Sequence, residues 1–302
     1  MTSASHHTTT GLSPKGHPHV GGFDPVRVSV IIPTFNRAWV IEEAVDSVLG
    51  QTYPNFELIV VDDGSTDDTR VRLQRYGGRI QVVHQRNQGV SAARNAGLRR
   101  AAGELIALLD SDDLWQPAKL ERQAAFFNAH PDARICQTEE TWIRRGVRVN
   151  PGHRHRKPSG WIFEDSLALC LVSPSAVMMR RELLEETGGF DESLPACEDY
   201  DLWLRVSLRY PIHLIDEPLV VKRGGHADQL SGAAGLDRYR IQSLDKILGR
   251  ENLTPTQARA AAAMLREKCR IYAAGCRKRG KIRSAEACEA LAGKHLSKHD
   301  SK

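Results

Sequence analysis

The segment VRVSVIIPTFNRAWVIEEAVDSVLGQTYPNFELIVVDDGSTDDT, residues 26–69, decides the fold class. Two runs rich in β-branched residues, one stopped by Pro33 and the other beginning at Phe56, are typical of buried strands. Between them, apolar residues recur at helical spacing, and Gly50 can end that helix. The helical spacing is carried by Val40, Ala44, Val45, Val48 and Leu49. The segment therefore predicts a strand, a helix and a second strand that ends in acidic turn residues.

The same alternation continues to residue 131. It predicts, in order, a weak helix (67–76), a short strand (Ile80–His84), a helix closed by Gly103 (87–103), a strand (104–109) and a helix with Pro117 in its first turn (116–131). Strands that are apolar almost throughout and alternate with helices are typical of a parallel sheet covered on both faces. The pattern therefore predicts an α/β fold.

The pattern changes after residue 133. We expect a strand over 133–146, a basic loop over 148–160, and then a strand, a short helix, a loop, an amphipathic helix and a last strand that complete the same sheet. Two or three helices follow from Leu236. The expected organisation is a disordered lead-in (1–25), one α/β domain (26–235) and a basic helical extension (236–302).

Composition excludes several classes of protein. The chain has 302 residues, 41% of them hydrophobic, which suffices for one large domain with an appendage. A membrane span needs roughly 18 consecutive apolar residues, and no such stretch is present. The polar N-terminus lacks the apolar core of a secretory signal. The six cysteines form no CxxC pair, so we expect reduced thiols in a cytoplasmic protein.

Positive charge is concentrated at the C-terminus. The net charge is +5, but residues 236–302 hold sixteen Lys or Arg against seven Asp or Glu, so the rest of the chain is net negative. A basic tail suits an anionic membrane surface or nucleic acid. A solvated helix face is the simpler interpretation, and we expect no nucleic-acid partner.

An acidic cluster ends the strand in GELIALLDSDDLW, residues 103–115. Asp110, Asp112 and Asp113 place three carboxylates in four positions, where they repel one another. A divalent cation could gather them, because it accepts oxygen ligands from Asp and from a diphosphate at once. Alternatively, Asp112 or Asp113 caps the next helix. Ligands of open α/β sheets bind beyond the carboxyl ends of the strands, where this cluster is predicted to lie.

A second acidic pair, Asp62 and Asp63, ends the strand that begins at Phe56. One of these carboxylates could accept a hydrogen bond from a base N–H or a ribose hydroxyl. The alternative is a turn that leads into a helix, which Gly64, Ser65 and Asp67 suit well. Both interpretations are compatible, with Asp67 capping the helix and Asp63 facing the ligand.

Four motifs taken together closely resemble family 2 of the glycosyltransferases. They are VSVIIPTFN, VVDDGSTDDT, the run NQGVSAARNAGLRRAAGELIALLDSDD, and GGFDESLPACEDYDLWLRV, and the resemblance covers roughly residues 27–225. It implies the GT-A fold, a Rossmann-like and mostly parallel sheet with helices on both faces, here followed by a C-terminal helical extension. It also implies an inverting, metal-dependent enzyme that uses a nucleotide-sugar donor, with a UDP-sugar as the expected one.

The resemblance implies roles for the residues at the strand ends. Asp110 and Ser111 would contact the donor, and Asp110, Asp112 and Asp113 would hold Mn²⁺ or Mg²⁺. Arg94 would lie near the nucleotide, unless it forms a structural salt bridge. The nucleoside would be held by Pro33, Thr34 and Phe35 along the base and by Asp63, with Asp62 as the other acid of the pair.

The segment ACEDYD would supply the catalytic base. Inversion needs a base on the face opposite the leaving nucleotide, to take the proton from the attacking hydroxyl. Asp199 matches the family's base, with its neighbour Glu198 as the second candidate; helix capping is the alternative for Asp199. His226 would be a third metal ligand or a phosphate contact. The basic loop 152–161 could cover the donor or the acceptor, and Trp115, Trp161 and Trp203 could stack on sugars or pack in the core.

Two other functions remain open on the sequence alone. A nucleotidyltransferase that makes sugar nucleotides would share the sheet and the metal acids, but the loop PTFNRA lacks its usual glycine-rich character. A catalytically inactive module that binds glycans or a partner is the other. For an active enzyme, we expect a glycan or lipid-linked acceptor of the cell surface, and peripheral contact with the inner membrane surface.

Overall fold

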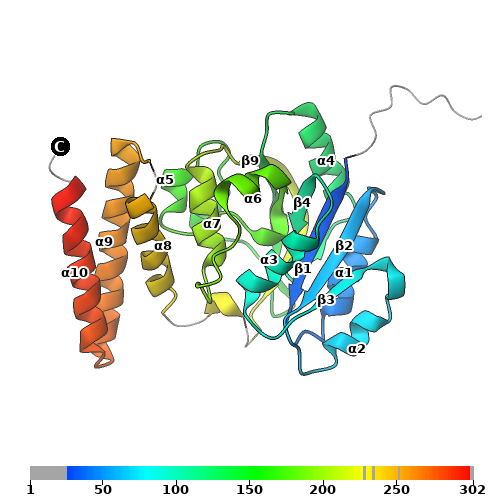
Figure 1. The fold of residues 1–302 in the computed structure, drawn as a ribbon, viewed down its shortest axis with the longest axis horizontal. Helices are drawn as coiled ribbons and strands as arrows, with labels where there is room; N and C mark the ends of the chain where they lie inside the picture. The colour runs from blue at the N-terminus through cyan, green and yellow to red at the C-terminus, as the bar shows by residue number, and fades with distance from the viewer. Residues whose placement is uncertain (1–25, 227–228, 233–234, 251, 300–302) are drawn as a thin grey trace, which may run out of the picture.

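The computed structural model describes residues 26–226, 229–232, 235–250 and 252–299 (Figure 1). The expected disordered lead-in, residues 1–25, lies outside these ranges. The strands are β1 (Val28–Thr34), β2 (Phe56–Asp62), β3 (Gln81–His84), β4 (Leu105–Leu108), β5 (Leu114–Trp115), β6 (Ile135–Arg144), β7 (Val147–Val149), β8 (Val177–Arg180) and β9 (His213–Gly224). The helices are α1 (Ile41–Leu49), α2 (Thr69–Gln74), α3 (Val90–Arg100), α4 (Lys119–Ala129), α5 (Phe163–Ser166), α6 (Arg181–Thr187), α7 (Glu198–Ser207), α8 (Asp237–Arg250), α9 (Pro255–Lys278) and α10 (Ile282–His299).

One sheet runs through the α/β part of the molecule in the order β3-β2-β1-β4-β8-β6-β9-β5, with β7 paired to β6. The first four strands are parallel, as the sequence predicts. β8 is antiparallel to both of its neighbours, and β5 is antiparallel to β9. The segments after residue 133 therefore complete the same sheet, as expected, but with reversed strands that the sequence pattern does not reveal.

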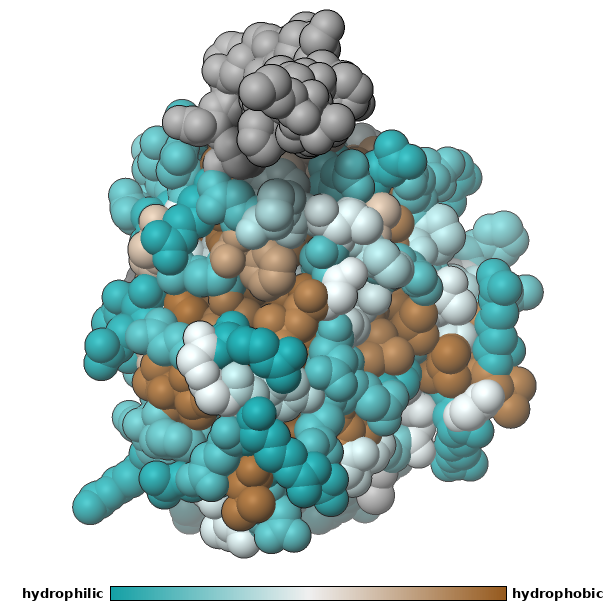
Figure 2. Space-filling view, turned by 90° about the vertical axis from the view of Figure 1, so that its right-hand side faces the viewer, coloured by the Kyte–Doolittle hydropathy of each residue, from teal (hydrophilic) through white to brown (hydrophobic). Residues whose placement is uncertain are grey.

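The sheet is covered on both faces, because side chains of its central strands alternate between two apolar clusters. In β1, Val30 and Ile32 pack on one face with α1 and α4, whereas Ile31 packs on the other with α3, α6 and α7. Figure 2, which views the end of the molecule opposite α10, shows a mostly hydrophilic surface with smaller apolar areas. Because the central strands are packed on both faces, their carboxyl ends are held in place at one edge of the sheet.

Two predicted helix boundaries are wrong for identifiable reasons. Pro117 precedes α4 instead of lying in its first turn, because the backbone N–H of Gln116 still bonds the sheet at Leu219. Gly103 does not end α3, which stops at Arg100. Instead, Gly103 passes so close to β1 that an added Cβ would lie 2.6 Å from the carbonyl oxygen of Arg27.

Helices α8, α9 and α10 lie side by side at the far end of the molecule from β1–β3 (Figure 1). α7 joins them to the sheet, because Tyr200 and Leu204 belong to a third apolar cluster with α8 and α9, whereas Leu202 and Trp203 face the sheet. The Thr254 hydroxyl accepts from the N–H of Gln257 and opens α9 with a capping box. Within the described ranges, the helices lack the combination of length and apolarity that crossing a bilayer requires.

Candidate active site

The carboxyl ends of β1, β2 and β4 bring the predicted site residues to one edge of the sheet. Thr34 is in register with Asp62, and Ile31 is in register with Leu108. Backbone hydrogen bonds continue past the strands, from Asp63 N–H to Thr34 O at 2.9 Å and from Leu109 N–H to Ile31 O at 3.0 Å. The sheet therefore holds the chain rigidly up to the acidic residues.

The residues expected along the nucleoside base form one wall of this edge. Pro33 and Thr34 are buried, and Phe35 is 40% exposed. The carboxylate of Asp62 is buried, accepting from the Ser65 N–H at 2.9 Å and contacting Nδ1 of His84 at 3.0 Å. Phe35 is thus the side chain of this wall that offers an accessible ring.

Asp63 holds the loop that leads into α3. Its carboxylate accepts from Gln85 Nε2 at 2.8 Å, from Gln88 N–H at 2.9 Å and from Gly89 N–H at 2.8 Å. Gly89 has a φ of 91°, a conformation that favours glycine. These three hydrogen bonds show that Asp63 stabilises the loop before α3. That Asp63 also contacts a nucleoside stays a prediction.

The acidic turn after β4 separates its three aspartates. The side chain of Asp110 is partly exposed, and Ser111 is buried. Asp113 is buried, and its carboxylate accepts from the Ser175 hydroxyl at 2.6 Å and from the Arg223 N–H at 2.8 Å. Burial, with Asp112 and Asp110 nearby, raises the pKa of Asp113 well above its ordinary value. Through its hydrogen bond with the Arg223 N–H, Asp113 fastens the turn to β9.

Asp112 meets His226 at the end of β9. Its Oδ2 lies 2.7 Å from Nε2 of His226, so residues 114 positions apart share one corner of the site. Burial, followed by the nearby Asp110, raises the pKa of Asp112. The indole of Trp39 packs edge-on against the His226 ring at 5.6 Å and remains largely exposed. No sequence pattern pointed to Trp39, which lies in a connecting turn.

Arg94 lies at the centre of the site. Its Nη2 donates to Asp110 Oδ1 at 2.7 Å, and its Nη1 donates to Glu198 Oε1 at 2.5 Å. The guanidinium is buried and packs over the ring of Phe190, 5.0 Å from its centroid. Burial alone would lower the pKa of Arg94, but Asp110 and Glu198 outweigh it and raise the pKa above the ordinary value. The structural salt bridge considered for Arg94 is present.

The predicted base lies at the start of α7. Cys197, just before the helix, has a left-handed backbone with φ 60°, a conformation that costs a non-glycine residue energy. Glu198 is buried against Arg94, and burial raises its pKa. Asp199 is less buried; its carboxylate accepts from the Tyr200 N–H at 2.7 Å and lies 3.5 Å from the thiol of Cys170. Of the two candidates, Asp199 has the more accessible carboxylate.

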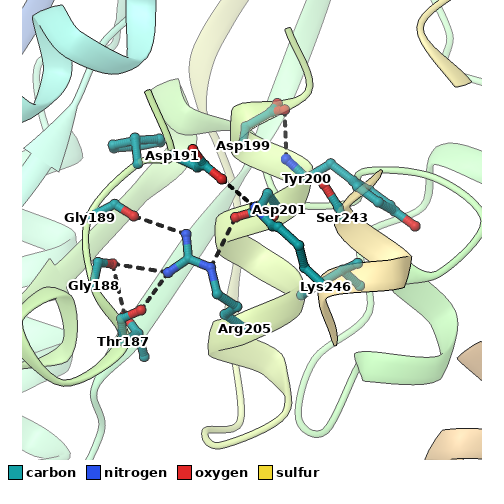
Figure 3. A network of polar contacts seen from close by, with 12 residues as sticks. Thr187, Gly188, Gly189, Asp191, Asp199, Tyr200, Asp201, Arg205, Ser243 and Lys246 are labelled. Atoms are coloured by element: carbon teal, nitrogen blue, oxygen red, sulfur yellow. Dashed lines mark hydrogen bonds and ion pairs between the residues drawn. The ribbon is translucent and has the colours of Figure 1, made fainter. Parts of the chain in front are cut away.

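The rest of α7 is anchored to α8 by a network of charges (Figure 3). Asp201 is 1% exposed and binds Nε of Arg205 at 3.0 Å and Nζ of Lys246 at 2.5 Å. Lys246 also reaches Oδ2 of Asp191 at 2.5 Å. Partial burial works against ionisation of Asp191, but the Lys246 and Ser193 hydrogen bonds outweigh it and lower the pKa to about 2. The network points away from Asp199, as helical spacing predicted for Asp201.

Sequence pattern did not identify three further residues of the site. Ser175, next to β8, accepts from the Asp110 N–H at 3.1 Å and donates to Asp113. Arg223 pairs with Glu43 at 2.7 Å and donates to the Asp112 carbonyl oxygen. Lys222 is half-buried, and although desolvation opposes its charge, the surrounding carboxylates, Glu140 first, raise its pKa. Sequence pattern could not find them, because their partners are distant in the chain.

The donor set suits a hard divalent cation. Asp110 and Asp112 offer carboxylate oxygens and His226 an imidazole nitrogen. Burial first, and then the nearby Asp110, raise the pKa of Asp112, and a bound cation would favour its ionised form. Mg²⁺ is commonly held by one or two carboxylates together with substrate phosphates. In the part of the chain that the structure describes, no three His, Cys, Asp or Glu side chains already enclose a metal position. The chemistry of the two carboxylates and the imidazole is what fits a metal shared with substrate phosphates.

Comparison with known proteins places the chain in a family. The sequence model described as "Glycosyl transferase family 2" matches residues 29–188, a range that ends before Asp199 and His226. A putative teichuronic acid biosynthesis glycosyltransferase, TuaG of Bacillus subtilis, is 50% identical over 182 residues, covering 59% of this chain and 70% of TuaG. An uncharacterized glycosyltransferase of Rickettsia felis is 33% identical over 213 residues, covering 67% of this chain. The match spans about a third, 35%, of that relative's length.

Solved structures share the fold. TarS 1–349 of S. aureus, in complex with UDP-GlcNAc, has a TM-score of 0.66 at 23% identity and covers 80% of this chain and 72% of its own. The mannosyltransferase PcManGT of Pyrobaculum calidifontis, in complex with GDP-Man and Mn²⁺, has a TM-score of 0.52 at 22% identity, covering 92% and 88%. The sequence matches, the shared fold and the gathering of the motif residues at one sheet edge lead to one conclusion: the chain belongs to family 2 of the glycosyl transferases.

Proposed function

We propose that this chain is an inverting, metal-dependent glycosyltransferase that moves a sugar from a nucleotide-diphosphate sugar to an acceptor hydroxyl. Arg94 carries the proposal: its guanidinium binds Asp110 of the acidic turn and Glu198 beside the proposed base. One buried cation thereby sets the distance between the donor end and the base end of the site. A transferase of this kind needs such a fixed distance, because both substrates must meet in line.

Asp199 is the proposed base. Its carboxylate takes the proton from the acceptor hydroxyl as the oxygen attacks the anomeric carbon and the bond to the diphosphate breaks. Glu198 is already committed to Arg94, so it acts as a positioning residue. With an acceptor as the attacking group, the sugar needs no covalent bond to the protein, and a single displacement inverts the anomeric centre.

Asp110, Asp112 and His226 are the residues that would hold Mn²⁺ or Mg²⁺. The ion would neutralise the charge that develops on the departing diphosphate. Asp113 keeps the turn in place through Ser175 and Arg223. The exposed ring of Phe35 would stack on the nucleoside base. The structures that share this fold include complexes with UDP-GlcNAc and with GDP-Man. We propose a UDP-sugar as the donor.

The biological setting we propose is synthesis of a cell-surface polysaccharide or glycolipid on the cytoplasmic side of the inner membrane. The name of TuaG refers to teichuronic acid biosynthesis, and this relative is 50% identical over the matched residues. The basic helices α8–α10 would give peripheral contact with an anionic leaflet. The family match argues against a nucleotidyltransferase, and a binding module without activity would leave the donor intact.

The decisive test is donor-dependent release of nucleoside diphosphate. A thermal-shift screen of UDP-, GDP- and dTDP-sugars with Mn²⁺ selects the donor, and turnover is then measured with and without EDTA. The proposal predicts turnover that EDTA abolishes and added Mn²⁺ restores. Donor binding without turnover in the presence of a range of glycan acceptors would favour the binding module instead.

A further inference from the structure

A cavity of about 510 Å³ lies beside the basic loop that the proposed mechanism does not use. Four potentially cationic side chains from this loop line it, together with one carboxylate from α5. The full lining consists of His153, Arg154, Arg156, Lys157, Pro158, Ser159, Asp165, Leu171 and Leu214. None of these residues comes from the strand ends that form the donor side of the site, so the cavity is separate from that side.

The loop is anchored to the sheet, which gives the cavity a fixed shape. Nζ of Lys157 is buried, donating to Thr138 O at 2.8 Å and lying 3.2 Å from Glu140 Oε1. Ser159 Oγ accepts from the Leu214 N–H at 3.1 Å, and Gly160 exchanges two backbone hydrogen bonds with Ile212. The carboxylate of Glu140 thus balances the positive charge of Lys157. Arg154 and Arg156, both exposed, supply the positive charge at the cavity.

One short segment of the chain connects the cavity with the proposed base. Leu171 lines it, and the adjacent residue, Cys170, places its thiol 3.5 Å from Oδ2 of Asp199. Consecutive Cα atoms are about 3.8 Å apart, so one short segment forms a wall of the cavity and a contact of the base. A chain-like acceptor lying in the cavity could therefore reach Asp199 with a terminal hydroxyl.

An exposed tryptophan follows on the same loop. Trp161 is 65% exposed, although its neighbours Gly160 and Ile162 are held by the sheet and the core. Trp115 and Trp203, the other candidates for sugar stacking, are buried and belong to the core. A large apolar ring held in solvent on the same loop as Arg154 and Arg156 is suited to a ligand that combines sugar faces with negative charge.

We propose that this cavity binds the acceptor and that the acceptor is an anionic glycan, with carboxylates or phosphodiesters in its repeating units. The inference rests on the proposed function and assigns the acceptor class of the same enzyme. Arg154 and Arg156 bind the anionic groups, with the planar forks that suit carboxylate and phosphate oxygens. Trp161 stacks on a sugar ring outside the cavity, and the chain end extends past Leu171 to Asp199.

The test compares three oligomers of equal length by titration at low salt: tetragalacturonate, a glycerol phosphate tetramer and neutral maltotetraose. At least one of the two anionic oligomers should bind the wild type more tightly than maltotetraose. The one that binds more tightly shows whether the site prefers carboxylates or phosphodiesters. In Arg154→Gln/Arg156→Gln, anionic binding should weaken on the order of tenfold or more, because two charge-assisted contacts are lost. The matched control, Arg99→Gln/Arg100→Gln at the exposed end of α3, removes the same charge far from the cavity in sequence and should retain wild-type binding.

Two results would overturn the inference: equal binding of anionic and neutral oligomers, or equal weakening in the control pair, which would indicate attraction by net charge alone. Trp161→Ala supplies a second measurement, since it should weaken binding without altering its salt dependence. Release of nucleoside diphosphate by the wild type is measured in parallel. If that release fails while the anionic oligomers still bind through Arg154 and Arg156, the proposed function is wrong and the binding site stands.

Discussion

Arg94 and Glu198 lie 104 positions apart in the chain, yet Nη1 of the arginine is 2.5 Å from Oε1 of the glutamate, and both side chains are buried. The second nitrogen of the same guanidinium holds Asp110. This ion pair therefore joins α3, the acidic turn after β4 and the start of α7. Disturbing it should affect stability and transfer together.

Arg94→Met should destabilise the fold by about 3–5 kcal/mol, because it leaves Glu198 buried without a partner. The double variant Arg94→Met/Glu198→Met should recover much of that loss, since no unpaired charge remains in the core. Urea unfolding monitored by tryptophan fluorescence measures both. A double variant less stable than the single variant would contradict the assignment of the pair.

Asp112→Asn should abolish metal-dependent nucleotide binding with the fold intact, because its carboxylate lies at a strand end and contacts His226. Calorimetric titration of UDP in the presence of Mn²⁺ measures this binding. Asp113→Ala is the contrast: losing the contacts to Ser175 and the Arg223 N–H should cost about 1–3 kcal/mol of stability. Wild-type nucleotide affinity in Asp112→Asn would refute the metal assignment.

Asp199→Asn should keep its affinity for the donor and lose transfer by roughly 10²–10⁴-fold, the usual contribution of a positioned base. The comparison requires the donor dissociation constant and the single-turnover rate with acceptor present. Glu198→Gln should differ by losing stability as well, because Glu198 is paired with Arg94. Wild-type transfer by Asp199→Asn would show that another residue is the base.

The buried Lys119 should make stability depend on pH. Burial lowers its pKa to about 7, whereas in the unfolded chain it keeps the ordinary value of 10.5. Between these values the unfolded state binds more protons, so the free energy of unfolding should rise with pH, by at most about 1.4 kcal/mol per unit. Below pH 7 the cost of burying the charge is present in full.

Lys119→Met removes this dependence and retains most of the side-chain volume. The difference in unfolding free energy between variant and wild type should therefore favour the variant near pH 6 and shrink as pH rises through 7 toward 10. Chemical unfolding at several pH values measures that difference, in which the contributions of other titrating groups cancel. A difference that is constant with pH would mean that Lys119 stays charged in its core position, over the ring of Trp115.

Lys246→Met should loosen α8 from α7 by leaving the buried Asp201 with Arg205 as its remaining charged partner, at a cost of about 1–3 kcal/mol. The transfer rate should also fall, since Asp199 lies on the same helix. Lys278→Met, in the exposed last turn of α9, is the matched control. Equal melting temperatures for the two variants would show that the Lys246 network does not contribute to stability.

Sequence pattern correctly predicted the strands and helices that are determined by residues close together in the chain. The alternation around Pro33, the acidic strand ends and the helical spacing from Ile41 to Leu49 are all set by near neighbours, and each matches the structure. The reversal of β8 and the roles of Ser175 and Arg223 depend on which strands become neighbours across the sheet. For the same reason, sequence pattern could not identify Glu198 as the partner of Arg94, because that contact depends on the position of α7.

The two-sided packing of α7 restricts how this enzyme could be diversified or engineered. Tyr200 and Leu204 belong to the cluster with α8 and α9, and Leu202 and Trp203 belong to the sheet. A chimera that exchanged the three terminal helices for those of a relative would meet a mismatched surface unless α7 travelled with them. The helix that carries Asp199 therefore couples the appendage to the sheet, so neither part can be exchanged without matching the surface of α7.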